Sequence, residues 1–313
     1  MTDAAAFHPN DYTFVLKSFV AGGIAGVCAK TTTAPVDRLK ILLQAENKHY
    51  KQYRVMQGFY AIWKNEGFLG YYKGNGAMIV RIFPYAAIQF MSYEQYKKLL
   101  RPYFNQKKHT SKLIAGSMTG ITAVTFTYPL DFVRARLAYQ VYERKYRSIV
   151  HTLTSVASTE GGVKALYRGF SSTILGMIPY AGVAFYTYEV MKSFLMENLN
   201  LISTRQSLDG SGTVVLNVPA SLFCGGISGA FSQTVSYPLD VARRRMQLAG
   251  MVSANPVYRS VFGTLAYVYR TSGIVGGLYR GMSINYIRAI PQVAVSFSVY
   301  ELMKQILGIS KPL

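Results

Sequence analysis

Long uncharged stretches alternate with polar, basic segments along the chain. Residues 210–239 form a run of 30 without a formal charge, residues 169–188 a run of 20, and residues 113–130 a run of 18. About 20 consecutive apolar residues suffice for a helix to cross a bilayer. The pattern therefore predicts membrane-spanning helices rather than the core of a soluble domain.

Three further candidate spans are interrupted by basic residues. They are residues 19–43 with Lys30, residues 74–93 with Arg81, and residues 282–300 with Arg288. A charge at membrane depth is costly unless it faces water or a partner. We therefore expect these helices to line a wet cavity, and the mean hydropathy of +0.15 fits helices that are polar on one side.

A proline element occurs three times along the chain. In each copy an acidic residue follows the proline by two positions and a basic residue follows it by five. The copies are Pro35-Asp37-Lys40, Pro129-Asp131-Arg134 and Pro238-Asp240-Arg243. Such a period indicates an internally repeated fold.

A second set of motifs follows each proline element in the same order. A Tyr-Lys/Arg-Gly turn opens an apolar stretch with its own proline, and a Tyr-Glu-x-x-Lys motif ends it. The turns end at Gly74, Gly169 and Gly281, and the later prolines are Pro84, Pro179 and Pro291. We read three repeats of two spanning helices each, arranged about a pseudo-three-fold axis with the binding site on that axis.

The predicted fold is an all-α membrane protein with six transmembrane helices. The polar stretches 53–66, 146–159 and 258–271 predict one short surface helix in each repeat. The predicted organisation is an N-terminal tail (1–12), followed by repeat 1 (13–105), repeat 2 (106–210) and repeat 3 (211–313).

Composition excludes several other classes of protein. Charged residues make up 15% of the chain, against about 25% in soluble domains, and its two cysteines exclude a disulfide scaffold. A nucleic-acid-binding protein would explain the net charge of +20 but not the threefold motif. The four histidines have no metal-ligand spacing, so we expect neither an enzyme nor a metal site.

These motifs together resemble the mitochondrial carrier family, solute carrier family 25. The resemblance covers nearly the whole chain and implies a multi-pass transporter of the mitochondrial inner membrane. It implies a monomer without a cofactor, with cardiolipin as bound lipid. The lipid is expected at Gly74, Gly169 and Gly281, where helix N-termini suit a phosphate.

The resemblance also implies two rings of ion pairs that cannot both be closed. The matrix gate would pair Asp37 with Arg134, Asp131 with Arg243 and Asp240 with Lys40, with Gln44 and Gln247 as hydrogen-bonding braces. The cytoplasmic gate would pair Lys97 with Glu189, Lys192 with Glu301 and Lys304 with Glu94. Alternation between the rings would give alternating access. The alternative for the first ring is a set of pairs within single helices.

Positions that break the symmetry are the candidates for substrate binding. Arg81, Gly176 and Arg288 each lie three residues before a later proline, at equal depth, and Lys30 adds a third cation. Gly176 leaves a slot for a flat ring, followed by Met177 and Tyr180. Neither arginine has an acid within ten residues on its own helix, so we expect an anionic ligand rather than a structural pair with a carboxylate of a neighbouring helix.

Similarity to the coenzyme A and adenine nucleotide branch of the family implies the substrate class. The expected function is transport of coenzyme A or a related adenine nucleotide phosphate, as an exchanger. One alternative is ADP/ATP transport. Residues 243–246 resemble the signature of those carriers, but the run of methionines is absent, which favours coenzyme A. The other alternative is a non-transporting scaffold with the carrier fold.

Overall fold

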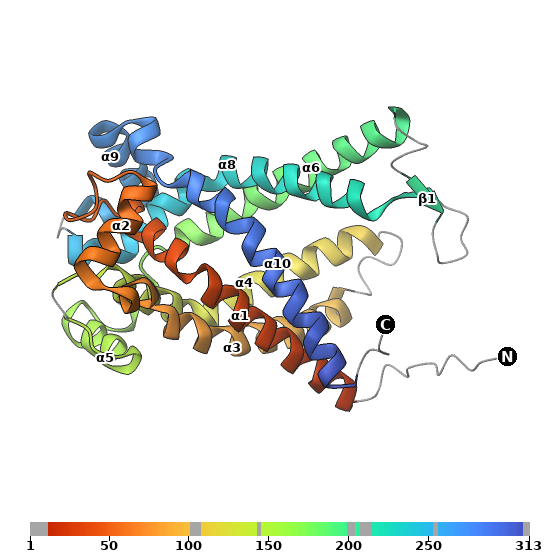
Figure 1. Ribbon diagram of the computed structural model, residues 1–313, viewed down its shortest axis with the longest axis horizontal. Coiled ribbons are helices and arrows are strands. Elements are labelled where there is room, and N and C mark those ends of the chain that lie inside the picture. Colours follow the sequence, from red (N-terminus) through yellow and green to blue (C-terminus); the bar gives the residue numbers. More distant parts are fainter. Residues whose placement is uncertain are drawn as a thin grey trace. The chain divides into compact units, whose positions relative to one another are not determined.

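The computed structural model describes residues 12–100, 108–142, 145–198, 204–206, 214–252 and 256–308. Within them, a long helix, a short helix and a second long helix follow one another three times (Figure 1). The first set is α1 (Tyr12–Gln44), α2 (Val55–Glu66) and α3 (Asn75–Leu100). The second is α4 (Lys108–Tyr139), α5 (Ile149–Thr159) and α6 (Phe170–Asn198), and the third is α8 (Val218–Val252), α9 (Val261–Ser272) and α10 (Met282–Ile306). This order is the one that the repeats predict.

One feature lies outside the all-helical prediction. The short strands β1 (Thr204–Gln206) and β2 (Val214–Leu216) pair antiparallel between α6 and α8, with Thr204 opposite Leu216. Two adjacent β-branched valines in the second strand favour the extended backbone. No helix in the described residues is both long and apolar enough to meet the usual hydropathy pattern of a membrane span.

The chain forms two compact units. The first comprises Met1–Tyr167, Gly250–Ser253 and Ser283–Leu313, and the second comprises Arg168–Ala249 and Ala254–Met282. In the first unit, α3 packs along α4, and α1 contacts both (Figure 1). Nearly all of α10 also belongs to this unit, where it is joined to α1 by polar contacts.

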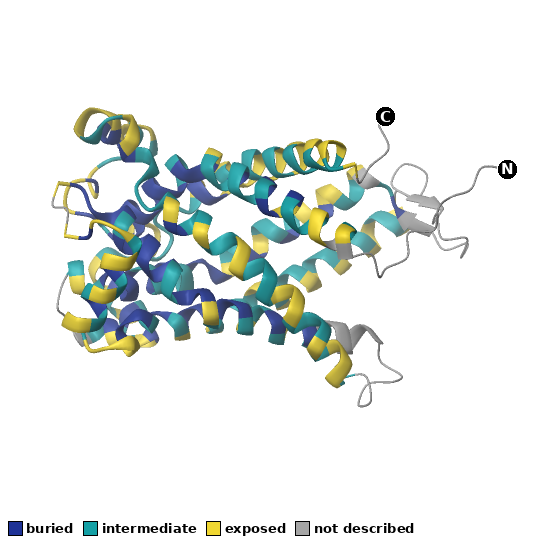
Figure 2. Cartoon of the chain, turned by 90° about the horizontal axis from the view of Figure 1, so that it is seen from below, coloured by how far each residue is buried: buried dark blue, intermediate teal, exposed yellow. Residues whose placement is uncertain are grey.

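Residues are most completely buried near the C-terminal ends of the first long helix of each repeat. Figure 2, coloured by burial, shows the buried residues gathered toward one end of the long helices. Residues 37–44 of α1 are all buried, as are residues 131–136 of α4. The N-terminal half of α1 alternates between buried, intermediate and exposed positions. The tightest packing in these helices therefore lies just beyond their prolines, where the charged motif begins.

Gly74 ends the turn that leads into α3, with φ = +84°. Most residues with a Cβ avoid this left-handed backbone. A Cβ at this position would also lie 2.8 Å from the carbonyl oxygen of Arg134, so the turn packs directly against the backbone of α4. Gly169 and Gly281 have the same conformation at the start of α6 and α10. The repeated glycine is thus fixed by backbone geometry.

The connection before this turn differs in the third repeat. Gly67 and Gly74 are seven positions apart, whereas Gly273 and Gly281 are eight apart. In the first two repeats the connection is a 3₁₀ turn, η1 (Phe68–Tyr72) and η2 (Val163–Tyr167), but in the third it is a π turn, η4 (Ile274–Leu278). A π turn holds more residues per turn, so it accommodates the additional residue of this connection.

Candidate functional site

Asp37, two positions after the proline of α1, is bonded to two arginines from different helices. Its Oδ2 accepts a hydrogen bond from Arg134 Nη2 of α4 at 2.5 Å, and its Oδ1 accepts one from Arg288 Nη1 of α10 at 2.7 Å. The predicted matrix-gate pair Asp37–Arg134 is therefore present. The carboxylate joins three helices of the first unit.

Asp131, the equivalent acid of α4, bonds to Arg81 of α3. Arg81 Nη1 lies 3.2 Å from Asp131 Oδ1, and its Nε lies 3.3 Å from Thr127 Oγ1, one turn earlier on α4. The guanidinium also lies over the ring of Tyr85, 5.3 Å from its centroid. The two hydrogen bonds hold the Arg81 side chain against α4.

The expectation that Arg81 and Arg288 have no structural carboxylate partner is wrong. Both form ion pairs with gate aspartates on neighbouring helices. The expectation relied on the absence of acids near each arginine along its own helix, but the partners are 50 and 251 residues away in sequence. The cations assigned to substrate are therefore also partners of the gate.

The aspartates of these ion pairs are more deeply buried than the arginines. The side chains of Asp37 and Asp131 are 4% and 2% exposed, whereas those of Arg81 and Arg288 are 15% and 25% exposed. The arginines are thus the accessible members of each pair. Lys30 of α1 is half-buried and donates from Nζ to Gln292 Oε1 of α10 at 3.1 Å. Three cations from three helices therefore remain partly accessible within one unit.

The second unit contains the remaining asymmetric residues. Gly176 of α6 lies against α8, since a Cβ there would be 3.5 Å from the Cβ of Leu239. Ser172 Oγ, one turn earlier, donates to the carbonyl of Leu239 at 2.7 Å. Asp240, the residue after Leu239, accepts a hydrogen bond at Oδ2 from Gln233 Nε2 of the same helix at 3.2 Å. Met177 is partly exposed and Tyr180 is exposed.

The other predicted gate pairs have different outcomes. Asp131–Arg243 and Asp240–Lys40 would join residues of different units and stay predictions, as does a brace by Gln44. Gln247 accepts a hydrogen bond from Arg244 of its own helix at 2.8 Å. In repeat 2 the brace position is Ala138, which is buried.

The predicted cytoplasmic pair Lys304–Glu94 is not formed within the first unit. Lys304 instead pairs with Glu301 at 2.9 Å, and Lys97 pairs with Glu94 at 3.7 Å, each within one helix. Lys97–Glu189 and Lys192–Glu301 would join different units and stay predictions. In the first unit, the matrix-gate pair is therefore formed and the cytoplasmic pair is not.

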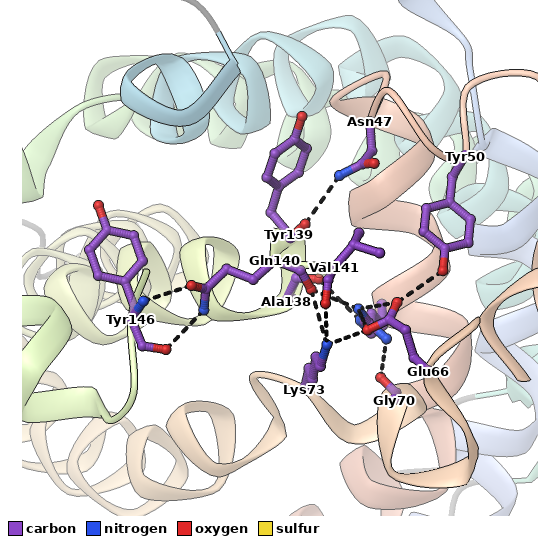
Figure 3. Close-up of polar contacts among 11 residues, drawn as sticks. Asn47, Tyr50, Glu66, Gly70, Lys73, Ala138, Tyr139, Gln140, Val141 and Tyr146 are labelled. Carbon is purple, nitrogen blue, oxygen red and sulfur yellow. Dashed lines mark hydrogen bonds and ion pairs between the residues drawn. The ribbon is translucent and has the colours of Figure 1, made fainter. Parts of the chain in front are cut away.

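Sequence reasoning missed a buried network centred on Arg38 of α1, the residue after Asp37. Figure 3 labels its partners Glu66, Gly70, Ala138 and Gln140. The Arg38 side chain is 1% exposed and forms an ion pair with Glu66, which is 3% exposed, at 2.8 Å. Arg38 also donates to three backbone carbonyls: Gly70 in η1, and Ala138 and Gln140 at the C-terminal end of α4. The sequence offers no signal for these contacts, because the partners are distant and mostly backbone.

Other side chains complete this network around Glu66 and the end of α4. Lys73 bonds to Glu66 and to the carbonyl of Val141, and Asn47 Nδ2 donates to the carbonyl of Tyr139 (Figure 3). Tyr50 Oη donates to Glu66 at 2.9 Å, and burial together with the negative charge of Glu66 raises the pKa of Tyr50 above its ordinary value. The last carbonyls of a helix have no hydrogen-bond partner within the helix. At the end of α4, side chains of repeat 1 donate to these carbonyls.

The described residues contain no group of three or more His, Cys, Asp or Glu side chains arranged to hold a metal ion. What the site offers chemically is a set of guanidinium and ammonium donors beside buried carboxylates. Such donors suit phosphate groups, since arginine donates hydrogen bonds in pairs.

Comparison with known proteins agrees with the repeats. Residues 11–104, 105–199 and 215–311 each match the family model described as mitochondrial carrier protein. The chain is 52% identical to human solute carrier family 25 member 16 over 291 residues, which are 93% of this chain and 88% of that protein. It is 40% identical to the Xenopus tropicalis mitochondrial coenzyme A transporter SLC25A42 over 297 residues, which cover 94% and 86% of the two chains.

Proposed function

The chain belongs to the mitochondrial carrier family, whose members are multi-pass transporters of the inner membrane and not enzymes, and from this premise we propose that it carries coenzyme A or a related adenine nucleotide phosphate. The carrier works without a cofactor and exchanges one substrate for another by alternating access. The observation that carries the proposal is the set of three partly accessible cations, Lys30, Arg81 and Arg288, on three helices of one unit.

These cations favour a substrate with several negative charges. Coenzyme A presents a diphosphate and a 3′-phosphate on one adenosine. A phosphate that loses one charged hydrogen bond in a confined site loses about 1.5–3 kcal/mol of binding free energy. The similarity to a coenzyme A transporter supports the same substrate class.

The slot at Gly176 accounts for the adenine part of the substrate. Gly176 packs against Leu239 of α8 in the direction where a side chain would point, so a flat ring would reach this part of α6 only on its partly exposed side; Met177 and Tyr180 follow on α6. The pantetheine arm needs length rather than charge, which the uncharged, aromatic-rich stretch 169–188 supplies.

Alternating access follows from the gate residues. With Asp37 paired to Arg134, and Lys304 turned to Glu301 of its own helix, the first unit supports a carrier closed on the matrix side and open on the cytoplasmic side. The ion pairs of the cytoplasmic ring can form only when those of the matrix ring are broken. Partly solvent-exposed ion pairs contribute about 1 kcal/mol each, so substrate binding can shift the equilibrium between the two closed states.

The carrier acts as a monomer with bound anionic lipid. Cardiolipin phosphates bind at the turns of Gly74, Gly169 and Gly281, each with a positive φ. The first N–H groups of α3, α6 and α10 have no partner within their own helix, which suits a phosphate. Added cardiolipin should therefore raise the melting temperature in detergent more than phosphatidylcholine does, since binding to the folded state stabilises it. Equal shifts with both lipids would contradict lipid binding at these turns.

Uptake by proteoliposomes tests the substrate. Vesicles loaded with coenzyme A are given labelled coenzyme A, with unlabelled coenzyme A, ADP, inorganic phosphate or pantetheine as competitors. We expect coenzyme A to compete best and pantetheine not to compete. Preference for ADP would favour the ADP/ATP type of carrier, and absence of uptake for every compound would favour the scaffold.

A further inference from the structure

Gln292 of α10 is a polar residue beside the proposed site that sequence reasoning did not select. Its Oε1 accepts a hydrogen bond from Lys30 Nζ of α1 at 3.1 Å. Arg288, which pairs with Asp37 of α1, lies four positions earlier on α10, so the side chains of Arg288 and Gln292 share one face of that helix. The helices α1 and α10 are therefore joined twice, by an ion pair and by the bond between Lys30 and Gln292.

The bond to Lys30 fixes the direction in which the amide of Gln292 points. An ammonium group only donates hydrogen bonds, so the amide oxygen faces Lys30 and the Nε2 group points away from it. Gln292 is partly exposed, and Lys30 is its one hydrogen-bond partner among the described residues. Both N–H donors of the amide can therefore bond to a ligand.

The ammonium of Lys30 also keeps donors for a ligand. It has three N–H groups, and in the described part of the chain only the one to Gln292 is used in a hydrogen bond. Lys30 is half-buried, and no described carboxylate forms an ion pair with it. The two side chains together thus present donors and no acceptor, which matches the oxygens of a phosphate.

The surrounding charges favour an anion beside Lys30. Its charge is attracted by Asp37 and repelled by three arginines, Arg81, Arg134 and Arg288. The amide of Gln292 carries no charge, so it orients the ammonium without neutralising it. An anion bound here would be attracted by every cation of the group.

We propose that Gln292 contacts the substrate and contributes to its specificity: with Lys30 it forms a phosphate subsite that fills without displacing a gate aspartate. The proposal rests on the proposed function and deepens it, because it says which donors meet the substrate first. At Arg81 and Arg288, by contrast, a phosphate competes with a carboxylate for the guanidinium. The first phosphate therefore binds at the subsite, and only further phosphates act on the gate.

The pairing of a lysine with an amide occurs at these positions in one place only along the sequence. The residues directly after the later prolines are Tyr85, Tyr180 and Gln292, and those five positions before the first prolines are Lys30, Val124 and Gln233. The equivalent of Gln292 in repeat 1, Tyr85, has its ring under Arg81 instead. The subsite is thus asymmetric, as recognition of one phosphate of an asymmetric substrate requires.

Two substitutions test the contact with substrate. Gln292→Met removes the amide at similar length, and Gln292→Glu keeps the size but replaces the donor group by a charged acceptor. The measurement is the concentration dependence of labelled coenzyme A uptake by loaded proteoliposomes. We expect the apparent affinity to fall about tenfold in Gln292→Met, the loss of one hydrogen bond to a charged group, and further in Gln292→Glu, whose carboxylate neutralises Lys30. A role in packing alone predicts the opposite order, because glutamate has the size of glutamine.

Gln305 supplies the matched control on the same helix. It is exposed near the C-terminal end of α10. Gln305→Met and Gln305→Glu make the same chemical changes away from the subsite. Both should transport like the wild type.

Competition by adenosine monophosphate separates the subsite from Arg288. Gln292→Met should weaken adenosine monophosphate and coenzyme A by about the same factor, since one phosphate occupies the subsite in both. Arg288→Ala should weaken coenzyme A at least about tenfold but the monophosphate much less, because a single phosphate does not need Arg288. This comparison needs no substitution at Gln292, so it decides the order of binding even if a Gln292 variant does not fold.

Melting temperatures in detergent show whether each variant is folded. Without ligand, the Gln292 variants should melt near the wild type, and the stabilisation by added coenzyme A should decrease from wild type to Gln292→Met to Gln292→Glu. The proposal is overturned if Gln292→Glu has the affinity of the wild type, or if Arg288→Ala weakens both competitors equally. A wild type that transports none of these compounds would instead refute the proposed function.

Discussion

Arg288 Nη1 lies 2.7 Å from Asp37 Oδ1, so the arginine that the sequence assigns to substrate bonds to a carboxylate of the gate. The other oxygen of Asp37 is bonded to Arg134. An anion that binds Arg288 competes directly with Asp37. The proposed substrate site and the predicted matrix gate therefore share charged residues in the first unit.

The first prediction concerns this shared arginine. Arg288→Ala should lower the apparent affinity for coenzyme A about tenfold to a hundredfold, because one phosphate loses a charged hydrogen bond. The measurement is the concentration dependence of uptake. Arg288→Lys keeps the charge but not the paired donors, and should retain more affinity than alanine. Unchanged uptake by Arg288→Ala would remove Arg288 from the substrate site.

The second prediction separates pairing between helices from pairing within one helix. Asp37→Arg should abolish uptake, and Arg134→Asp in the same chain should restore part of it. Restoration is incomplete because the new arginine would lie beside Arg288. Asp37→Arg with Lys40→Asp, on α1 alone, should restore less. Better restoration by the α1 swap would show that the pair within one helix matters more.

The third prediction concerns the network around Arg38. Arg38→Ala leaves Glu66 buried with one cation fewer and leaves the carbonyls of Ala138 and Gln140 without this donor. Loss of one partner of a buried ion pair costs about 3–5 kcal/mol. Thermal unfolding in detergent should show a large decrease in melting temperature. Lys64→Ala on the exposed face of α2 is the control, and an equal melting temperature for both variants would contradict the assignment.

The fourth prediction concerns the turn at Gly74. Gly74→Ala should lower stability by at least about 1–2 kcal/mol, the cost of a left-handed backbone with a Cβ. The contact with the carbonyl of Arg134 adds to this cost. Gly76→Ala, two residues later in α3, is the control, since a Cβ there meets nothing within 4 Å. Similar melting temperatures for the two variants would show that the turn tolerates a side chain.

The repeats predicted the order of helices because each motif carries its own local structure. Proline, glycine and a charged pair at fixed spacing specify where helices begin and which face is polar. The pair Asp37–Arg134 could also be predicted, because the resemblance to the carrier family implies that the acid of one repeat meets the base of the next. These features depend on short-range sequence and on symmetry.

The partners of Arg81 and Arg288 could not be found in this way. A search for acids along the same helix misses a carboxylate contributed by a neighbouring helix, and only packing brings Asp131 to Arg81. Arg38 is a stronger case, since three of its four partner residues contribute backbone carbonyls, which no side-chain pattern marks. The strands β1 and β2 were likewise not predicted, because three residues are too few for a recognisable alternation.

Three arginines, Arg81, Arg134 and Arg288, share two aspartates, Asp37 and Asp131, and Lys30 bonds to the neutral Gln292. Among these six charged side chains the cations exceed the carboxylates by two, and an electrical potential across the inner membrane acts on every charge that moves. Each elementary charge that crosses 100 mV changes the free energy by about 2.3 kcal/mol. A substrate with more than two negative charges reverses the sign of this excess. If the chain exchanges such a substrate as proposed, the loaded and the empty carrier would respond to the same voltage in opposite directions, and the potential would drive exchange in one direction.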